Sequence, residues 1–196
     1  MVTLLWVNGT IDPALTEGHA FYHAHPFNVG QHVAHNIMLD ECVKLGVDWH
    51  IRVDDDCWIT TRKWLDKLLG LQEQIKALTG KHAVLGMTVN GLNDPPPTVK
   101  KFEFQKFGML EVTEILGGIF RMSPMPLVRY FRWDERQAMG FGDATQFASY
   151  CESTKTVMGR MAKVACTHGD STRKQSVSNP SWSYEHDMLQ FIPLGL

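Results

Sequence analysis

Residues 49–56 have the sequence Trp49-His50-Ile51-Arg52-Val53-Asp54-Asp55-Asp56. The apolar residues of this stretch alternate with His50 and Arg52, which is the period of a β-strand that buries one face. Three carboxylates follow, and like charges packed this closely repel one another unless a divalent cation binds among them. Because the strand ends of an open α/β sheet face the ligand crevice, we predict a metal site here. A solvated acidic turn or a helix N-cap is the alternative, and it would suit one Asp better than three.

The composition is typical of one globular domain with a real core. The chain has 196 residues, of which 44% are hydrophobic and 20% charged, and its formal net charge is −2. It contains no long run of Lys or Arg, so the sequence does not predict a nucleic-acid-binding or membrane-binding surface. It also has no apolar stretch of membrane-spanning length and no signal peptide. Four widely spaced cysteines without a CxxC pair predict free thiols in a reducing cytoplasm: Cys42, Cys57, Cys151 and Cys166.

Turn residues and hydrophobic alternation predict the strands. We expect buried strands at 2–7, 49–53, 83–88 and 163–168, and a β-hairpin or two strands within 99–116 around Phe107-Gly108. Residues 93–97 contain three consecutive prolines and must form a loop, because proline cannot donate to a β-ladder.

Three helices are expected from caps and helical periodicity. The first follows Asn28-Val29-Gly30, stops at Gly46 and is predicted to bury Val33, Ile37, Met38, Cys42 and Leu45. The second begins near Thr60 or Thr61, stops at Gly80 and is predicted to bury Trp64, Leu65, Leu68, Leu69 and Ile75. The third begins at Asp143, stops at Gly159 and is predicted to bury Phe147, Cys151 and Met158. The spacing of Arg129, Arg132 and Arg136 is also helical and indicates a solvated helix face.

Five of the nine histidines fall within residues 17–35: His19, His23, His25, His32 and His35. No cysteine joins them and they belong to two separate segments, so a closed zinc site is not indicated. We interpret them as aromatic and loop-lining residues.

Six motifs, in order along most of the chain, resemble those of the GT-A glycosyltransferases, particularly the family 2-like group. Residues 4–12 look like the second strand of that family and its "DNGSxD" turn. Asn28-Val29-Gly30 with Ala34-His35-Asn36 resembles the "N-x-G-x-x-x-A-x-N" helix start, and residues 53–56 followed by Trp64-Leu65 resemble the metal-binding DxD and the helix after it. The segment 117–121 resembles the glycine-rich strand under the donor sugar, and 141–145 resembles the "GED" acceptor-side helix. His168 is placed like the terminal metal-binding histidine of the family.

The resemblance implies an α/β fold: a single GT-A-like (Rossmann-like) domain over 1–196, with a mostly parallel sheet flanked by helices and 168–196 as an acceptor-side tail. It implies a metal-dependent transferase, of the inverting kind, that moves a sugar from a nucleoside-diphosphate sugar to an acceptor hydroxyl. The metal, Mn²⁺ or Mg²⁺, would be held by Asp54, Asp56 and His168. The donor-binding residues would be Asn8, Asn28, Gly30, Asn36, Asp54, Asp55, Gly117 and Gly118.

The acceptor hydroxyl needs a positioned base, and Asp143 is the candidate; a plain helix N-cap is the alternative reading of the same residue. The donor nucleotide would be uridine or guanosine diphosphate, and the acceptor would be a glycan, a lipid, a protein or a modified DNA base.

Two departures from the family pattern bear on this hypothesis. The chain starts after the strand and helix that usually cradle the nucleotide base, so base recognition would fall to another segment or to a second subunit of an oligomer. The acidic pair at the acceptor-side helix is reduced to Asp143 beside Ala144.

A non-catalytic nucleotide-sugar or glycan binder of the same fold is therefore the main alternative. A metal-dependent phosphatase of the haloacid dehalogenase type is a weaker one, because Trp58 stands where that motif has Thr or Val.

Overall fold

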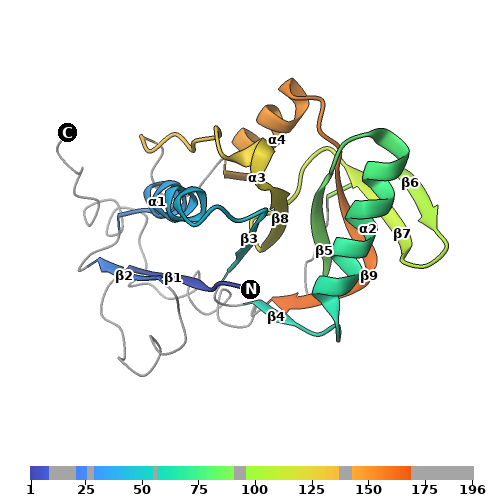
Figure 1. Cartoon of the computed structure of the whole chain (residues 1–196), viewed down its shortest axis with the longest axis horizontal. Coiled ribbons are helices and arrows are strands. Elements are labelled where there is room, and N and C mark those ends of the chain that lie inside the picture. Colours follow the sequence, from blue (N-terminus) through green and yellow to red (C-terminus); the bar gives the residue numbers. More distant parts are fainter. Residues whose placement is uncertain (9–20, 26–28, 55–56, 91–95, 137–142, 169–196) are drawn as a thin grey trace, which may run out of the picture.

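The structure, a computed structural model, describes residues 1–8, 21–25, 29–54, 57–90, 96–136 and 143–168. The helices are α1 (Gln31–Lys44), α2 (Trp64–Thr79), α3 (Met125–Val128) and α4 (Asp143–Ser153). The strands are β1 (Leu4–Asn8), β2 (Phe21–His25), β3 (Trp49–Val53), β4 (Cys57–Ile59), β5 (Val84–Asn90), β6 (Thr98–Phe104), β7 (Gly108–Thr113), β8 (Phe120–Pro124) and β9 (Met158–His168). Figure 1 shows how they are arranged.

Seven strands form one mixed sheet. Six follow the order β3-β8-β5-β9-β7-β6, and β4 pairs with β9 outside this path. Within the described residues, β5 and β9 run parallel, whereas the pairs β3–β8, β5–β8, β7–β9, β6–β7 and β4–β9 are antiparallel. The α/β class is confirmed, but a mostly parallel, Rossmann-like sheet is not. The direction of a buried strand leaves no mark in its apolar periodicity, so the sequence could not distinguish the two arrangements.

A second, two-stranded sheet is formed by β1 and β2, which pair in parallel from Leu4↔Phe21 to Asn8↔His25. The strand predicted at 2–7 therefore begins two residues later, and Val2 is 48% exposed rather than buried. The strand β2 lies within the histidine-rich segment and was not predicted.

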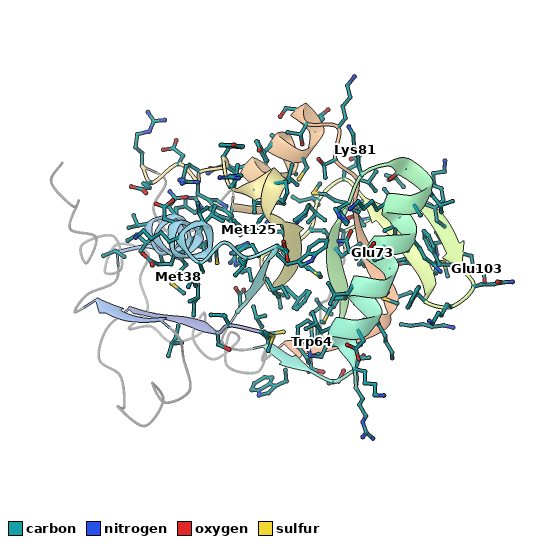
Figure 2. All side chains as sticks on the ribbon, in the orientation of Figure 1. Met38, Trp64, Glu73, Lys81, Glu103 and Met125 are labelled. Atoms are coloured by element: carbon teal, nitrogen blue, oxygen red, sulfur yellow. The ribbon has the colours of Figure 1, made fainter. Side chains whose placement is uncertain are left out.

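Helices cover both faces of the seven-stranded sheet. On one face α2 packs Leu68, Leu71 and Ile75 against Leu85, Met122 and Met161 of the strands. Trp64, at the start of α2, meets the ring of Phe120 edge-on at 5.6 Å between centroids (Figure 2). On the other face, residues of α1, α3 and α4 form a second core that contains Leu39, Val128, Phe147 and Cys151. All five residues of β8 are buried, whereas in its neighbour β3 only Arg52 is buried and Val53 is 43% exposed.

The interior face of α1 differs from the predicted one. Its buried residues are His32, Ala34, Asn36, Leu39 and Cys42. Of the residues expected there, Cys42 is buried, but Leu45 is 48% exposed. Hydropathy failed because the polar side chains that face inward have partners: His32 Nδ1 lies 2.8 Å from the carbonyl oxygen of Asp134, and Asn36 bonds to Trp133.

Other boundaries agree or shift. The strands at 83–88 and 99–116 and the helices from Trp64 and Asp143 are confirmed. Met158 and Gly159, expected at the end of the last helix, instead begin β9. The helix expected from the arginine spacing is also wrong, because α3 ends at Val128 and the following residues bend back along α1. Lys63, not a threonine, occupies the N-cap of α2, since Thr60 and Thr61 both bond to the backbone of Ala165.

All four cysteines are free thiols. None of the described helices is long and apolar enough to cross a membrane.

Candidate functional site

The acidic stretch that follows β3 borders a buried polar face shared by β3 and β8. These strands pair so that Arg52 stands opposite Arg121 and His50 opposite Ser123. Residues of β3 and β8 at the alternate positions, such as Ile51 and Met122, belong to the core under α2. Side chains alternate along a strand, so the two arginines, the histidine and the serine face α1 and α4 instead.

Two arginines directly opposite each other on one sheet face repel, and this pair is stabilised by one carboxylate. Asp143, the first residue of α4, accepts a hydrogen bond from Nη1 of Arg52 on its Oδ2 atom. Its Oδ1 atom lies 3.7 Å from Nη2 of Arg121. Arg52 is 8% exposed, Arg121 is 1% exposed and Asp143 is 4% exposed, so the three residues form a buried ion cluster.

Arg52 also bonds to the first residue of the acidic stretch. Its Nε and Nη2 atoms lie 3.3 Å and 3.1 Å from Oδ1 of Asp54. The backbone N–H of Asp54 donates to the carbonyl oxygen of Ile119 at 3.0 Å. This bond connects the end of β3 to the residue that follows Gly117-Gly118, the diglycine segment. One guanidinium group thus joins the carboxyl end of β3 to the N-terminus of α4.

Arg121 is the most deeply buried charge of the cluster. Its guanidinium carbon lies 3.8 Å from the ring centroid of Phe147 and 5.4 Å from that of Trp133. Within the described part of the chain, its Nη1 and Nη2 atoms have no hydrogen-bond partner, and neither has Oδ1 of Asp143. Burial lowers the pKa of Arg121 to about 10, against the opposing effect of Asp143. The charged form of an arginine buried in this way is stabilised by the nearby carboxylate of Asp143.

Two histidines adjoin the arginines. Burial, together with the charges of Arg121 and Arg52, lowers the pKa of His50 to about 4. The pKa of His35 on α1 is also well below its usual value, first because of burial and then because of Arg52. The ring of His35 lies 5.1 Å from that of Trp133. Both histidines are therefore neutral at physiological pH.

The diglycine segment separates the ion cluster from a small pocket. A Cβ atom on Gly118 would lie 2.7 Å from Nη2 of Arg52 and 2.8 Å from Oδ2 of Asp143, so no larger residue fits there without displacing the ion pair. A Cβ atom on Gly117 would meet nothing within 4 Å. Gly117 lines a pocket of about 180 Å³, in which Thr113 is almost fully buried without a hydrogen-bond partner for its hydroxyl among the described residues.

Of the predicted metal ligands, the structure describes Asp54 and the backbone of His168. In the pairing of β4 with β9, His168 stands opposite Cys57, the residue that follows Asp56. Asp55, Asp56 and the side chain of His168 lie outside the described residues, and among those described no group of three or more metal-ligating side chains occurs. The register therefore places the backbone of His168 opposite a residue that is three positions after Asp54 in the sequence.

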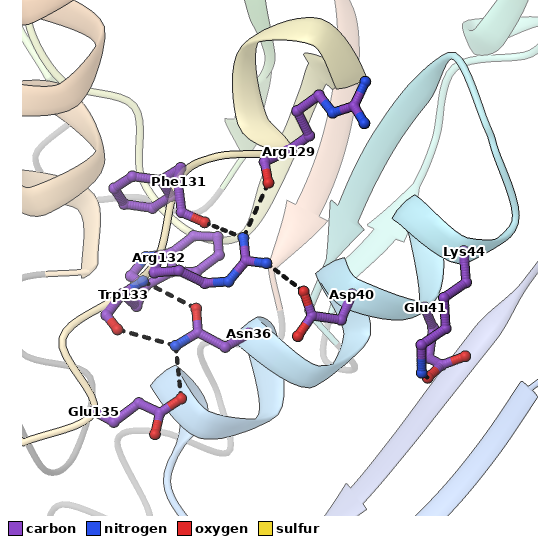
Figure 3. A network of polar contacts seen from close by, with 9 residues as sticks. All are labelled: Asn36, Asp40, Glu41, Lys44, Arg129, Phe131, Arg132, Trp133 and Glu135. Carbon is purple, nitrogen blue, oxygen red and sulfur yellow. Dashed lines mark hydrogen bonds and ion pairs between the residues drawn. The ribbon is translucent and has the colours of Figure 1, made fainter.

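Asn36 and Gly30, predicted to bind the donor, have structural roles. Both amide hydrogens of Asn36 are used, because Nδ2 donates to the carbonyl of Trp133 at 3.0 Å and to Oε1 of Glu135 at 2.8 Å (Figure 3). Its Oδ1 atom accepts from the N–H of Trp133. Gly30 begins α1 with a positive φ of 85°, which glycine adopts without strain. Asn28 lies outside the described residues. Asn8, also predicted to bind the donor, is the last residue of β1, and its backbone pairs with that of His25.

The predicted base, Asp143, is not placed as a free carboxylate. Burial raises its pKa, but Arg52 and Arg121 outweigh this effect, and the net pKa lies below the usual value. The nearest upstream carboxylates differ: Asp134 is bonded to Arg136, which lowers its pKa to about 2, whereas Glu135 is exposed and accepts from Asn36. A carboxylate with a lowered pKa binds a proton more weakly than a free one, and the charge of Asp143 is paired with the two arginines.

Sequence reasoning missed the arginines and histidines of this site. The alternation predicts one buried face for the strand at 49–53 and gives no role to Arg52 or His50, and Arg121 enters the prediction only as part of a glycine-rich motif. The available signal was the run of three acidic residues beside Arg52, which offers a buried arginine a partner.

No protein-family model matches the sequence, and no curated protein matches it significantly. Among solved structures the chain is similar to the one titled "Crystal Structure of A197 from STIV", with a TM-score of 0.47 and 12% identity over 86% of this chain and 85% of that one. A similarity this remote carries no argument about fold or function.

Replacing Asp143 by Asn should lower the free energy of unfolding by about 3–5 kcal/mol, because it leaves two buried arginines without their shared counter-charge. Asn caps a helix as well as Asp does, so a lost cap would not explain the change. Urea denaturation measures it. Asp134→Asn, which removes a carboxylate paired with an exposed arginine, is the matched control and should have little effect. Equal stabilities of parent and Asp143→Asn would contradict the buried ion cluster.

Stability should also fall as the pH is lowered from 6.5 to 4. The folded-state pKa of His50, about 4, lies below its unfolded value, so the unfolded chain binds more protons in this window. The loss should reach about 3 kcal/mol for His50, with a further contribution from His35, and Asp residues should add theirs only at lower pH. His50→Asn should flatten the slope of unfolding free energy against pH. An unchanged slope would mean that His50 is not held neutral by its surroundings.

Proposed function

We propose that this protein is a metal-dependent glycosyltransferase that moves a sugar from a nucleoside-diphosphate sugar to an acceptor hydroxyl. One observation carries the proposal. Asp54, Gly118 and Asp143 belong to three motifs separated by 64 and 25 residues in the sequence, and all three lie around the guanidinium group of Arg52. Motifs this distant along the chain converge at one place if they serve one site.

The residues at the end of β3 fit a divalent cation. Carboxylate oxygens suit Mg²⁺ and Mn²⁺, and a histidine nitrogen suits Mn²⁺. Asp54, Asp56 and His168 would hold the ion, since β4 follows the acidic stretch and pairs with the end of β9. When bound, the cation would neutralise the diphosphate that leaves with the nucleotide. The protein holds Asp54 at both ends, because its carboxylate accepts from Arg52 and its backbone N–H donates to the carbonyl of Ile119.

The pocket beside Gly117 supports a place for the donor sugar. Glycine lets a ligand approach the backbone closely, and no side chain occupies the space in front of this residue. Thr113 contributes a buried hydroxyl to the lining of the pocket. Arg160 and Glu111 also line it, and because they form an ion pair 2.7 Å apart, their charges cancel. Apolar residues such as Leu116 and Phe120 form the rest of the wall. Such a lining suits a neutral, hydroxyl-bearing ring.

A non-catalytic nucleotide-sugar binder of the same fold is the second candidate. The observation that favours it is the burial of Asp143 between two arginines, since the lowered pKa of this carboxyl makes it a weaker proton acceptor. Donor hydrolysis or transfer to any acceptor would decide for the enzyme. A thermal-shift screen of nucleotide sugars with and without Mn²⁺ finds the donor first, because a ligand that binds the folded state raises its melting temperature.

Asp56→Asn should abolish Mn²⁺-dependent binding of uridine or guanosine diphosphate, whichever the parent binds, while the melting temperature stays near that of the parent. The reason is the loss of one carboxylate from the metal site, and isothermal calorimetry with and without Mn²⁺ measures it. Asp54→Asn should weaken binding as well. The control is Asp66→Asn, which removes an exposed carboxylate from the first turn of α2 and should bind like the parent. Equal affinities of parent and Asp56→Asn would remove the metal role.

Gly117→Val and Gly118→Ala should separate the sugar pocket from the ion cluster. The new side chain at 117 enters open space, so binding of the nucleotide sugar should weaken while that of the bare diphosphate and the stability are kept. The methyl group at 118 meets Arg52 and Asp143 and should cost about 1–3 kcal/mol of stability. Calorimetry and urea denaturation give the two readouts. If Gly117→Val bound both ligands like the parent, the pocket would not hold the sugar.

A further inference from the structure

Arg52 makes contacts that no other described residue of the site makes. Its guanidinium group bonds to Asp54, two residues along the chain, and to Asp143, 91 residues away. Its side chain is 7% exposed, that of Asp143 is 6% exposed and that of Asp54 is 26% exposed. The arginine therefore connects a carboxylate that solvent reaches to one that is buried.

The shape of the guanidinium group makes this connection rigid. Nε and Nη2 engage Oδ1 of Asp54, while Nη1 engages Oδ2 of Asp143. The nitrogen atoms of a guanidinium group lie in one plane at fixed angles. The bond from Nη1 to Asp143 therefore also sets the positions of Nε and Nη2, which bond to Asp54. A lysine carries the same charge but has a single nitrogen on a flexible stem, and it cannot hold both carboxylates in this way.

The surroundings leave Arg52 little freedom. The backbone of Gly118 covers its Nη2 atom and central carbon so closely that a Cβ atom would lie within 2.9 Å of both. Arg121 stands opposite on β8 and, having the same charge, disfavours movement of Arg52 toward it. Asp143, as the first residue of α4, is fixed by the helix that follows it. Contacts with Gly118, Arg121 and Asp143, all outside the acidic stretch, thus help to fix the position of Arg52.

We infer that Arg52 is a positioning residue, which holds Asp54 in place for the cation and is itself held by Asp143 at the start of α4. The inference rests on the proposed function, since it assigns Asp54 to a cation site. It also gives Asp143 a role other than that of a base: Asp143 anchors Arg52. A positive charge beside a cation site weakens cation binding by repulsion. Arg52 therefore favours cation binding only if the affinity gained by orienting Asp54 exceeds the affinity lost to this repulsion.

The test compares Arg52→Lys with the parent in calorimetric titrations of Mn²⁺ in the presence of uridine or guanosine diphosphate. The charge is kept, so electrostatic repulsion of the cation stays about the same and the loss of the planar bridge is isolated. Partners that orient a metal ligand typically contribute 10- to 100-fold in metal affinity, and we expect a loss of about tenfold or more. Arg132→Lys is the matched control, because Arg132 also bonds to an aspartate on a distant segment, Asp40 on α1 (Figure 3). It should bind like the parent.

A second measurement uses the parent protein and so does not depend on how a variant folds. In nitrogen-edited NMR of arginine side chains, Mg²⁺ with the diphosphate should shift the Nε–H resonance of Arg52 and leave that of Arg132 in place. Parent-like affinity in folded Arg52→Lys, or an unmoved Arg52 resonance in a parent that binds Mg²⁺, would overturn the positioning role and leave the proposed function standing. A parent that binds no cation with any nucleoside diphosphate would overturn both.

Discussion

The buried ion pair between Arg52 and Asp143 is the interaction on which the rest of the site depends. The pairing of β3 with β8 places two buried arginines opposite each other on one face of the sheet. Such an arrangement is stable only if a carboxylate enters the same layer, and α4 brings one in at its first residue. Gly118 approaches the same pair closely, and burial, followed by the charges of the arginines, lowers the pKa values of His35 and His50.

This constraint relates parts of the fold that are otherwise separate. The strand β3, the segment Gly117-Gly118 before β8 and the start of α4 each contribute a group to the cluster, and Asp54, the residue after β3, bonds to the same arginine with a side chain that is 26% exposed. On the α1 side, Asn36 and His32 bond to the segment of Trp133 and Asp134, which carries the aromatic ring beside Arg121. The polar residues of α1 thus hold the wall of the arginine site. A buried polar network of this kind favours one packing arrangement, because each alternative leaves a charge or an amide without a partner.

Asp143 shows why a motif alone does not define the role of a residue. In the sequence, an aspartate that opens a helix can cap it, accept a proton or pair with a cation. Its role depends on residues 91 and 22 positions upstream, Arg52 and Arg121, which lie on two different strands. Their effect on its pKa opposes and exceeds that of burial.

The sequence by itself determined the elements that have strong local signals. Val84–Asn90 is a strand because it is a short apolar run between turns, α2 has its apolar stripe, and Phe107-Gly108 makes a hairpin where glycine takes a positive φ. It also located the acidic end of β3 and the diglycine before β8. Tertiary structure alone decided the direction of the strands, the polar interior of α1 and the cluster around Arg52. The physical reason is that periodicity reports whether a residue is apolar, whereas the burial of Arg52, Arg121, His32 and Asn36 depends on partners that are distant in the sequence.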